Sequence, residues 1–255
     1  MRVHVVSDVH GNSEALARAG EGADALVCLG DLILFLDYAN HARGIFPDLF
    51  GAENATRLVR LRNERRFEEA RALSAELWSG LRMDRRTAIE GAVRRQYAEL
   101  FAAFPAPTYA TYGNVDLPGL WPEFARDGVT VLDGQTTEIG GLRFGFVGGG
   151  LPSPMRTPFE IPEEEYAAKV AALGRVDVLC THVPPAVPDL TYDVVARRFE
   201  RGSEAVLQAI HETQPAYALF GHVHQPLRRR LRIGRTECVN VGHFNATGRP
   251  WVLDV

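Results

Sequence analysis

The order of apolar and polar positions along the chain predicts alternating strands and helices. Residues 3–6, 25–29 and 176–180 form short, uninterrupted apolar runs, which is typical of strands buried on both faces. Asn12-Ser13 is a plausible cap for a helix that runs to about Gly20. The first two runs and this helix therefore predict a βαβ unit, and the fold class is expected to be α/β.

The second half of the chain continues this pattern with more strands. Asp133-Gly134 and Gly140-Gly141 are turn signals that favour antiparallel pairing among strands at residues 108–112, 129–132, 136–139 and 142–147. Helices at 162–173 and 203–212 alternate with strands at 176–180 and 216–220. The end of the chain is predicted to form hairpins from strands at 227–233, 236–241 and 251–255.

Residues 38–105 interrupt this pattern with a helical segment. Residues 53–80 and 84–104 carry apolar side chains at helical spacing between dense arginine and glutamate, and Pro105 and Pro107 end the second helix. We expect a two-helix insert within one domain of residues 1–255. We expect it to act either as a lid over the site or as a homo-oligomer interface. The interface is the main competitor of the lid, because the apolar stripe of the insert must pack against another surface. The stripe comprises Leu58, Leu61, Leu73, Leu77, Trp78 and Leu81.

The composition of the chain limits the class of protein and the location that can be expected. The chain has 255 residues, 46% of them hydrophobic, and no apolar run that is long enough to cross a bilayer, which predicts a soluble protein without a membrane partner. It enters a strand at once, without a signal-peptide pattern, so we expect a cytoplasmic protein. The formal charge of −4 gives no general attraction for nucleic acid. Three distant cysteines predict reduced core thiols.

Five short motifs at the ends of predicted strands carry the candidate chemistry. They are Asp8-Val9-His10, Gly30-Asp31, Gly113-Asn114, Thr181-His182 and Gly221-His222-Val223-His224. In open α/β sheets, functional groups collect beyond the carboxyl ends of the strands, so these motifs are expected to converge. They supply seven metal-binding side chains, namely Asp8, His10, Asp31, Asn114, His182, His222 and His224.

This set of side chains favours two divalent ions held close together. A carboxylate bridges two ions because its oxygens diverge, and Asp31 is the candidate bridge. Oxygen and imidazole ligands without a thiolate suit manganese, iron or zinc better than calcium. Taken singly, each residue also has an ordinary explanation, such as a turn residue at Asp8 or a core histidine at His182. The joint order of the motifs is what favours a metal site.

In this order the motifs resemble the D-x-H, G-D, G-N, lone His and G-H-x-H pattern of the calcineurin-like metallophosphoesterase superfamily. The resemblance spans residues 3 to about 244 apart from the insert. It implies a four-layer α/β/β/α sandwich of two mixed β-sheets flanked by helices. It also implies hydrolysis by a metal-bridging hydroxide. The first ion would be held by Asp8, His10, Asp31 and His224, and the second by Asp31, Asn114, His182 and His222.

The fourth motif departs from the pattern that family phosphatases commonly show. Val115 stands where those enzymes have a histidine that protonates the leaving group, and losing such an acid typically costs on the order of 10²- to 10⁴-fold. Members with G-N-C-D or G-N-V-D resemble this chain best, and several of them are phosphodiesterases. We therefore expect a phosphodiesterase in which Asp31, Asn114 and His182 are catalytic. The alternatives are a phosphomonoesterase or protein phosphatase of the same superfamily, or a non-catalytic protein-binding scaffold, as in the retromer subunit with this fold.

The expected partner is a small phosphate-ester substrate, with nucleotides among the choices. Residues 148–150 are three consecutive glycines, but they lack the Lys-Ser and the helical pattern of a P-loop, so a strand-end loop is predicted. His243 follows another predicted strand. It is either a residue on the rim of the active site or an ordinary loop histidine.

Overall fold

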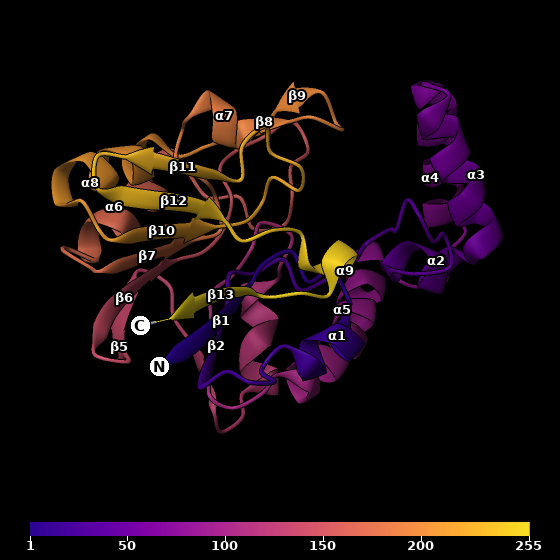
Figure 1. The fold of residues 1–255 in the computed structure, drawn as a ribbon. Helices are drawn as coiled ribbons and strands as arrows, with labels where there is room; N and C mark the ends of the chain where they lie inside the picture. The colour runs from indigo at the N-terminus through magenta and orange to yellow at the C-terminus, as the bar shows by residue number, and fades with distance from the viewer. Residues whose placement is uncertain (255) are drawn as a thin grey trace. The chain divides into compact units, whose positions relative to one another are not determined.

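The computed structural model describes residues 1–254, which form two compact units. One unit contains Met1–Leu32 and the residues from Leu100 onward, and the other is Ile33–Glu99. Figure 1 shows that the first unit holds the two large β-sheets, whereas the second is entirely helical apart from its loops. Within residues 1–254, no helix is both long enough and apolar enough to cross a bilayer.

The first sheet has five strands and is mostly parallel. Four of its strands run parallel, and β13 is antiparallel to β1 at one edge. The order is β13 (Trp251–Asp254), β1 (Arg2–Val6), β2 (Ala25–Cys28), β3 (Thr108–Ala110) and β4 (Val129–Val131).

The second sheet has six strands, of which the central four run parallel and the two at the edges are antiparallel. The order is β11 (Arg230–Ile233), β12 (Thr236–Asn240), β10 (Tyr217–Phe220), β7 (Val178–Thr181), β6 (Leu142–Val147) and β5 (Gln135–Ile139). After β7 the chain forms α7 (Pro188–Thr191) and a separate two-stranded sheet of β8 (Tyr192–Asp193) and β9 (Arg198–Phe199).

The two sheets pack face to face through one apolar core. Val5 and Val27 of the first sheet share this core with Phe144, Val178 and Leu219 of the second, and all five are fully buried. Because successive side chains of a strand alternate between its faces, the remaining apolar positions face outward towards helices.

Helices cover the outer faces of both sheets. Beyond the second sheet, α6 (Glu163–Ala172) and α8 (Glu204–Thr213) supply the buried side chains Tyr166 and Val206 to a second core. On the first sheet, His4 of β1 donates a hydrogen bond from Nδ1 to the carbonyl of Ala19, just after α1 (Ser13–Arg18), at 2.7 Å. The predicted α/β/β/α sandwich of two mixed sheets is therefore confirmed.

The predicted antiparallel pairing of residues 108–147 is only partly right. β5 and β6 are antiparallel, but β3 and β4 run parallel. A crossover that contains the 3₁₀ helix η1 (Pro118–Phe124) separates β3 from β4, so no tight hairpin joins them. Leu132 N–H donates to Ala110 in the first sheet, whereas Gly134 N–H donates to Phe146 in the second. The turn at 133–134 thus carries the chain from one sheet to the other.

The C-terminal hairpin prediction holds for β11 and β12 alone. β13 leaves that sheet and pairs antiparallel with β1, with Trp251 opposite Val5. The short helix α9 (Phe244–Thr247) lies in the connection. Val255, the predicted last residue of this strand, lies outside the described residues. Cys28, Cys180 and Cys238 are free and buried, as expected.

The unit Ile33–Glu99 corresponds to most of the predicted insert, but it has more helices than expected. It contains α2 (Ile45–Phe50), α3 (Ala52–Asn63), α4 (Phe67–Ser79) and most of α5 (Arg85–Ala103), around a core that includes Phe46, Leu58 and Leu73. The single helix predicted over 53–80 is broken at 64–66. Arg65 has φ 58°, and the N–H groups of Arg65 and Arg66 donate to the carbonyls of Arg62 and Leu61. This is a Schellman motif, which ends a helix.

Candidate metal centre

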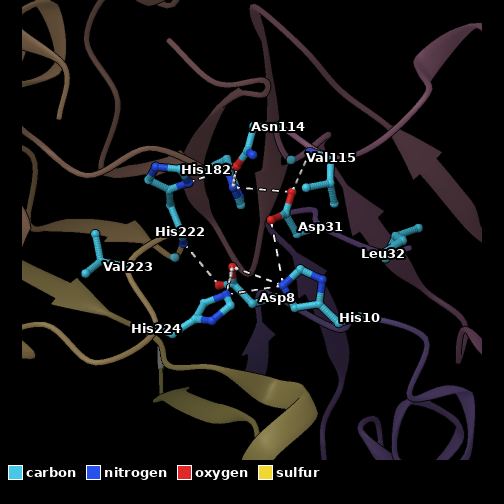
Figure 2. Close-up of polar contacts among 12 residues, drawn as sticks. Asp8, His10, Asp31, Leu32, Asn114, Val115, His182, His222, Val223 and His224 are labelled. Carbon is cyan, nitrogen blue, oxygen red and sulfur yellow. Dashed lines mark hydrogen bonds and ion pairs between the residues drawn. The ribbon is translucent and has the colours of Figure 1, made fainter. Parts of the chain in front are cut away.

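Both sheets deliver predicted ligands to one edge of the sandwich. Asp8, Asp31 and Asn114 follow β1, β2 and β3 of the first sheet, while His182 follows β7 and His222 follows β10 of the second. Figure 2 shows the side chains of these five residues, with those of His10 and His224, turned towards one another. The structure therefore brings all seven sequence-predicted residues together.

The backbone at this site is unusual. Asp8, His10, Asp31 and His222 have φ values of 57°, 40°, 56° and 67°, and they are four of the eight non-glycine residues with positive φ among residues 1–254. Non-glycine residues seldom adopt this region, because it crowds Cβ against the backbone. Such conformations persist where the surrounding structure holds them, and they cluster at functional sites.

The glycines of the motifs allow the loops to pack backbone against backbone. A Cβ atom on Gly30 would overlap the backbone of Gly113, and one on Gly113 would overlap the Asp31 carboxylate. On Gly221 it would overlap the side chains of Ser7 and Asp8. The glycines of G-D, G-N and G-H are therefore required by close approach.

Asp116 ties two of the ligand loops together. Its carboxylate accepts hydrogen bonds from the N–H groups of Asp31 (2.9 Å), Leu32 (3.0 Å) and Gly113 (2.8 Å). Burial and the neighbouring charge of Asp31 raise the pKa of Asp116 to about 7, against the lowering effect of its backbone donors. The last residue of Gly-Asn-Val-Asp thus holds the site in shape.

The first predicted ligand group is Asp8, His10, Asp31 and His224. Nε2 of His10 lies 3.2 Å from Nε2 of His224 and 3.8 Å from Oδ2 of Asp31. Nε2 of His224 lies 3.4 Å from Oδ1 of Asp8. These four side chains direct nitrogen and oxygen atoms to a common point, which is what chelation requires.

The second group is Asp31, Asn114, His182 and His222. Oδ1 of Asn114 is 2.8 Å from Nε2 of His182 and 2.8 Å from Nδ1 of His222. Oδ1 of Asp31 is 3.5 Å from Nε2 of His182. Asp31 therefore faces the first group with one oxygen and the second with the other (Figure 2).

His182 shows why this donor set fits a cation. Its Nδ1 lies 2.9 Å from the carbonyl oxygen of Leu29, and its Nε2 lies 2.8 Å from Oδ1 of Asn114. A neutral imidazole has one N–H and can donate to only one of these oxygens. Donation to the backbone carbonyl leaves a nitrogen lone pair facing an amide oxygen, which a shared cation would stabilise. Metal-binding histidines commonly donate their other N–H in this way.

The ionisation states also fit a metal centre. Burial alone would raise the pKa of Asp8, but the hydrogen bond and charge of His224, with the charges of His182 and His10, hold it well below its usual range. Burial and the nearby His182 lower the pKa of His222 to about 4. A carboxylate and neutral imidazoles are the forms that bind metal. Oδ1 of Asp8 is moreover buried, and Nε2 of His224 lies 3.4 Å from it.

His224 shows the opposite shift. Burial tends to lower the pKa of His224, but its hydrogen bond with Asp8 and the charges of Asp8 and Asp31 outweigh burial and raise that pKa. A proton and a divalent cation therefore compete for this imidazole, because both are attracted by the same two carboxylates.

Val115 lies beside Asp31 (Figure 2), where its side chain has no proton to give. Its backbone N–H donates to Oδ1 of Asp31 at 3.0 Å. The glycines at 148–150 have a structural role instead of forming a phosphate cradle. The N–H groups of Gly149 and Gly150 donate to the carbonyls of Tyr112 and Phe159, as expected for a strand-end loop.

His243 belongs to this site, although the sequence pattern left its role open. Its ring stacks on that of His224 with the centroids 3.9 Å apart, and it meets His10 edge-on at 5.6 Å. Burial, followed by the charges of His224 and His10, lowers the pKa of His243 to about 4. The available signal was its position after β12, since this strand runs parallel to β10 and ends at the same edge.

Comparison with known proteins identifies one family by sequence and similar solved structures by fold. The sequence profile of the calcineurin-like phosphoesterases matches residues 1–226, whereas no curated protein sequence matches significantly. One solved structure is 18% identical over 99% of this chain and 94% of its own, with a TM-score of 0.62. The protein TT1561 of Thermus thermophilus is 15% identical over 99% of this chain and 98% of its own, with a TM-score of 0.59. At these identities the two structures show a shared fold alone.

Proposed function

Because the chain belongs to the calcineurin-like phosphoesterase family, we propose that it is a metal-dependent hydrolase acting on small phosphodiesters. The observation that carries this proposal is the position of Asp31. Its Oδ2 is 3.8 Å from His10 and its Oδ1 is 3.5 Å from His182, so one carboxylate serves two convergent sets of ligands. A shared carboxylate of this kind suits a dinuclear centre.

We assign one ion to Asp8, His10, Asp31 and His224, and the other to Asp31, Asn114, His182 and His222. Manganese, iron and zinc all suit these ligands. Bound divalent ions would supply an activated water as nucleophile and would neutralise charge on the phosphoryl group.

The protein's own contribution is to hold the ligands in place. The amide nitrogen of Asn114 donates to Oγ1 of Thr157 at 3.1 Å, which keeps Oδ1 of Asn114 directed at the two histidines. The carbonyl of Leu29 fixes the ring of His182, and the Val115 amide fixes Asp31. Fixed ligand groups lower the reorganisation needed when substrate binds.

Val115 supports a preference for phosphodiester substrates over phosphomonoesters. The support comes from the resemblance of Gly-Asn-Val-Asp to phosphodiesterase-like family members. Without an acid at this position, a substrate that needs a protonated leaving group reacts slowly. A phosphomonoesterase or protein phosphatase is therefore the less favoured alternative.

Bis(p-nitrophenyl) phosphate and p-nitrophenyl phosphate test the preference, because they differ in ester number but share a leaving group. With manganese, iron or zinc, the diester is expected to react faster. Faster hydrolysis of the monoester would contradict the diester assignment and leave the metal site intact. A protein that binds none of these metals and hydrolyses neither ester would instead be a scaffold.

Replacing the shared carboxylate tests the site itself. Asp31→Asn is expected to lower kcat by about 100-fold or more, because an amide supplies one neutral oxygen in place of two charged ones. The exposed Asp127→Asn is the matched control and should retain full turnover. Metal content by mass spectrometry should fall in Asp31→Asn alone. Turnover above a few per cent in a metal-saturated Asp31→Asn variant would refute the assignment.

A further inference from the structure

His243 lies against two predicted metal ligands without belonging to any of the five motifs. Its ring plane is 13° from that of His224 and 81° from that of His10. One ring nitrogen from each of these three histidines lies within 4.8 Å of the others. The imidazole of His243 thus borders the first ligand group.

Backbone hydrogen bonds fix this position. The N–H of Phe244 donates to the carbonyl of Ser7 at 3.0 Å, and the N–H of Asn245 donates to that of Asp8 at 3.0 Å. On the other side, the N–H of Gly242 donates to Oδ1 of Asn240 at 2.9 Å. The turn that carries His243 is therefore attached to the loop that carries Asp8.

Both nitrogens of the His243 ring are shielded from solvent and have no hydrogen-bond partner among residues 1–254. Burying an unpaired polar group costs free energy, so native proteins seldom keep one without a functional reason. Oδ1 of Asp8, a predicted ligand of the first group, is also buried and has Nε2 of His224 3.4 Å away. A ligand at the first group is therefore the natural partner of His243.

The stacking geometry identifies the kind of partner. An imidazole nitrogen binds a metal in the plane of its ring, and two nearly parallel stacked rings cannot both direct a nitrogen at one ion. His224 already directs its Nε2 at the first group. His243 is therefore better placed to reach an oxygen bound at this group than to bind the ion itself. A neutral imidazole offers one N–H donor, which matches a phosphoryl oxygen.

We infer that His243 is a substrate-binding residue that donates its ring N–H to a phosphoryl oxygen at the His10–His224 end of the centre. This inference rests on the proposed phosphoesterase function. It concerns a different part of the site from Val115, which contacts the Asp31 oxygen that faces His182. His243 thus adds a contact for the phosphoryl group and is not a replacement for the missing acid.

His243→Phe and His243→Gln separate this role from a structural one. Phenylalanine keeps the stacked ring but removes the N–H, whereas glutamine removes the ring but keeps an amide donor. Inorganic phosphate is the probe, and its affinity for the manganese-loaded protein is measured by calorimetry. Manganese content by mass spectrometry and the melting temperature of the metal-free protein are measured alongside. His211→Phe on the exposed face of α8 is the matched control.

His243→Phe should bind manganese like the wild type, but it should bind phosphate about 10- to 100-fold more weakly, the loss expected for one hydrogen bond to a charged group. His243→Gln should lose less affinity. The melting temperature of metal-free His243→Phe should not fall, because the substitution removes an unpaired polar group. His211→Phe should match the wild type throughout.

Loss of manganese from His243→Phe would make His243 a metal ligand and overturn the inference. Unchanged phosphate affinity in that variant would also overturn it. If the wild type binds manganese but no phosphate, or binds none of manganese, iron and zinc, the proposed function fails together with the inference. If the wild type binds both and His243→Phe does too, only the inference fails.

Discussion

At the level of single residues, side-chain chemistry at strand ends was predictable and backbone conformation was not. The seven predicted ligands were identifiable because carboxylate, amide and imidazole groups follow apolar runs in a characteristic order. The positive φ values of Asp8, His10, Asp31 and His222 arise from packing between loops far apart in the chain. The stacking of His243 on His224 has the same origin. No local pattern encodes such contacts.

Asp116 offers a test of how the site is held together. Asp116→Asn replaces one acceptor oxygen by an NH₂ group, which then faces a backbone N–H. The free energy of unfolding in urea should fall by about 1 to 3 kcal/mol. Asp127→Asn, at an exposed position, should change it little. Equal stability of the two variants would show that the three backbone hydrogen bonds to Asp116 contribute nothing measurable.

His243 also predicts a pH dependence in the metal-free protein. The pKa of His243 is lowered to about 4 in the folded state, while an unfolded histidine has a pKa of about 6.5. Between these values the unfolded chain binds the additional proton, so the stability of the wild type falls as pH falls from 6.5 towards 4. His243→Phe lacks this contribution. As the pH falls through that window, the free energy of unfolding of His243→Phe should rise relative to that of the wild type. The same pH dependence of the free energy of unfolding in both proteins, measured in urea, would contradict the prediction.

At the level of elements, apolar runs and turn signals located the strands of the sandwich to within a few residues, but they did not determine the pairing of the strands. Asp133-Gly134 is a common hairpin signal, yet here it moves the chain between sheets, which depends on where β4 and β5 find partners. The end of α3 was missed because no glycine or proline marks it. Arg65 adopts the left-handed conformation that glycine normally supplies.

This helix end yields a stability prediction. Arg65→Gly should raise the free energy of unfolding by roughly 0.5 to 1 kcal/mol, because glycine adopts a φ of 58° without a clash of Cβ. Asn63→Gly, at the last residue of α3, should lower it by roughly 0.3 kcal/mol. Thermal unfolding of the two variants provides the comparison. The same sign of change in both would show that Arg65 is not strained.

At the level of the whole molecule, the α/β/β/α arrangement followed from the family resemblance. The resemblance did not indicate whether residues 38–105 act as a lid or as an interface. Their helical character and apolar stripe were visible in the sequence, and four of the six stripe residues contribute to the core of this unit, namely Leu58, Leu61, Leu73 and Leu77. Phe67 remains 54% exposed and Met83 57% exposed, although both are large and apolar. These two side chains are the candidate contact points for self-association of the helical unit.

We therefore expect the helical unit to mediate a homodimer, with the lid as the competing role. Phe67→Asp should convert a dimer into a monomer, as measured by light scattering after size exclusion, without changing turnover. Ala72→Asp, at an exposed position on another face of the same helix, adds the same charge and is the matched control. A monomeric wild type would exclude the dimer, and lost turnover in monomeric Phe67→Asp would favour the lid.

The division of the ligands between the two sheets has a mechanical consequence. Asp8, Asp31 and Asn114 come from one layer, whereas His182 and His222 come from the other. An ion bound by this set would link the two sheets at the edge where the ligands lie. Amide protons of β2 and β10 should then exchange more slowly with solvent after manganese is added, whereas the exchange rates of those in β5 and β11 should not change. Removing the metal with a chelator should restore the faster exchange at the edge where the ligands lie.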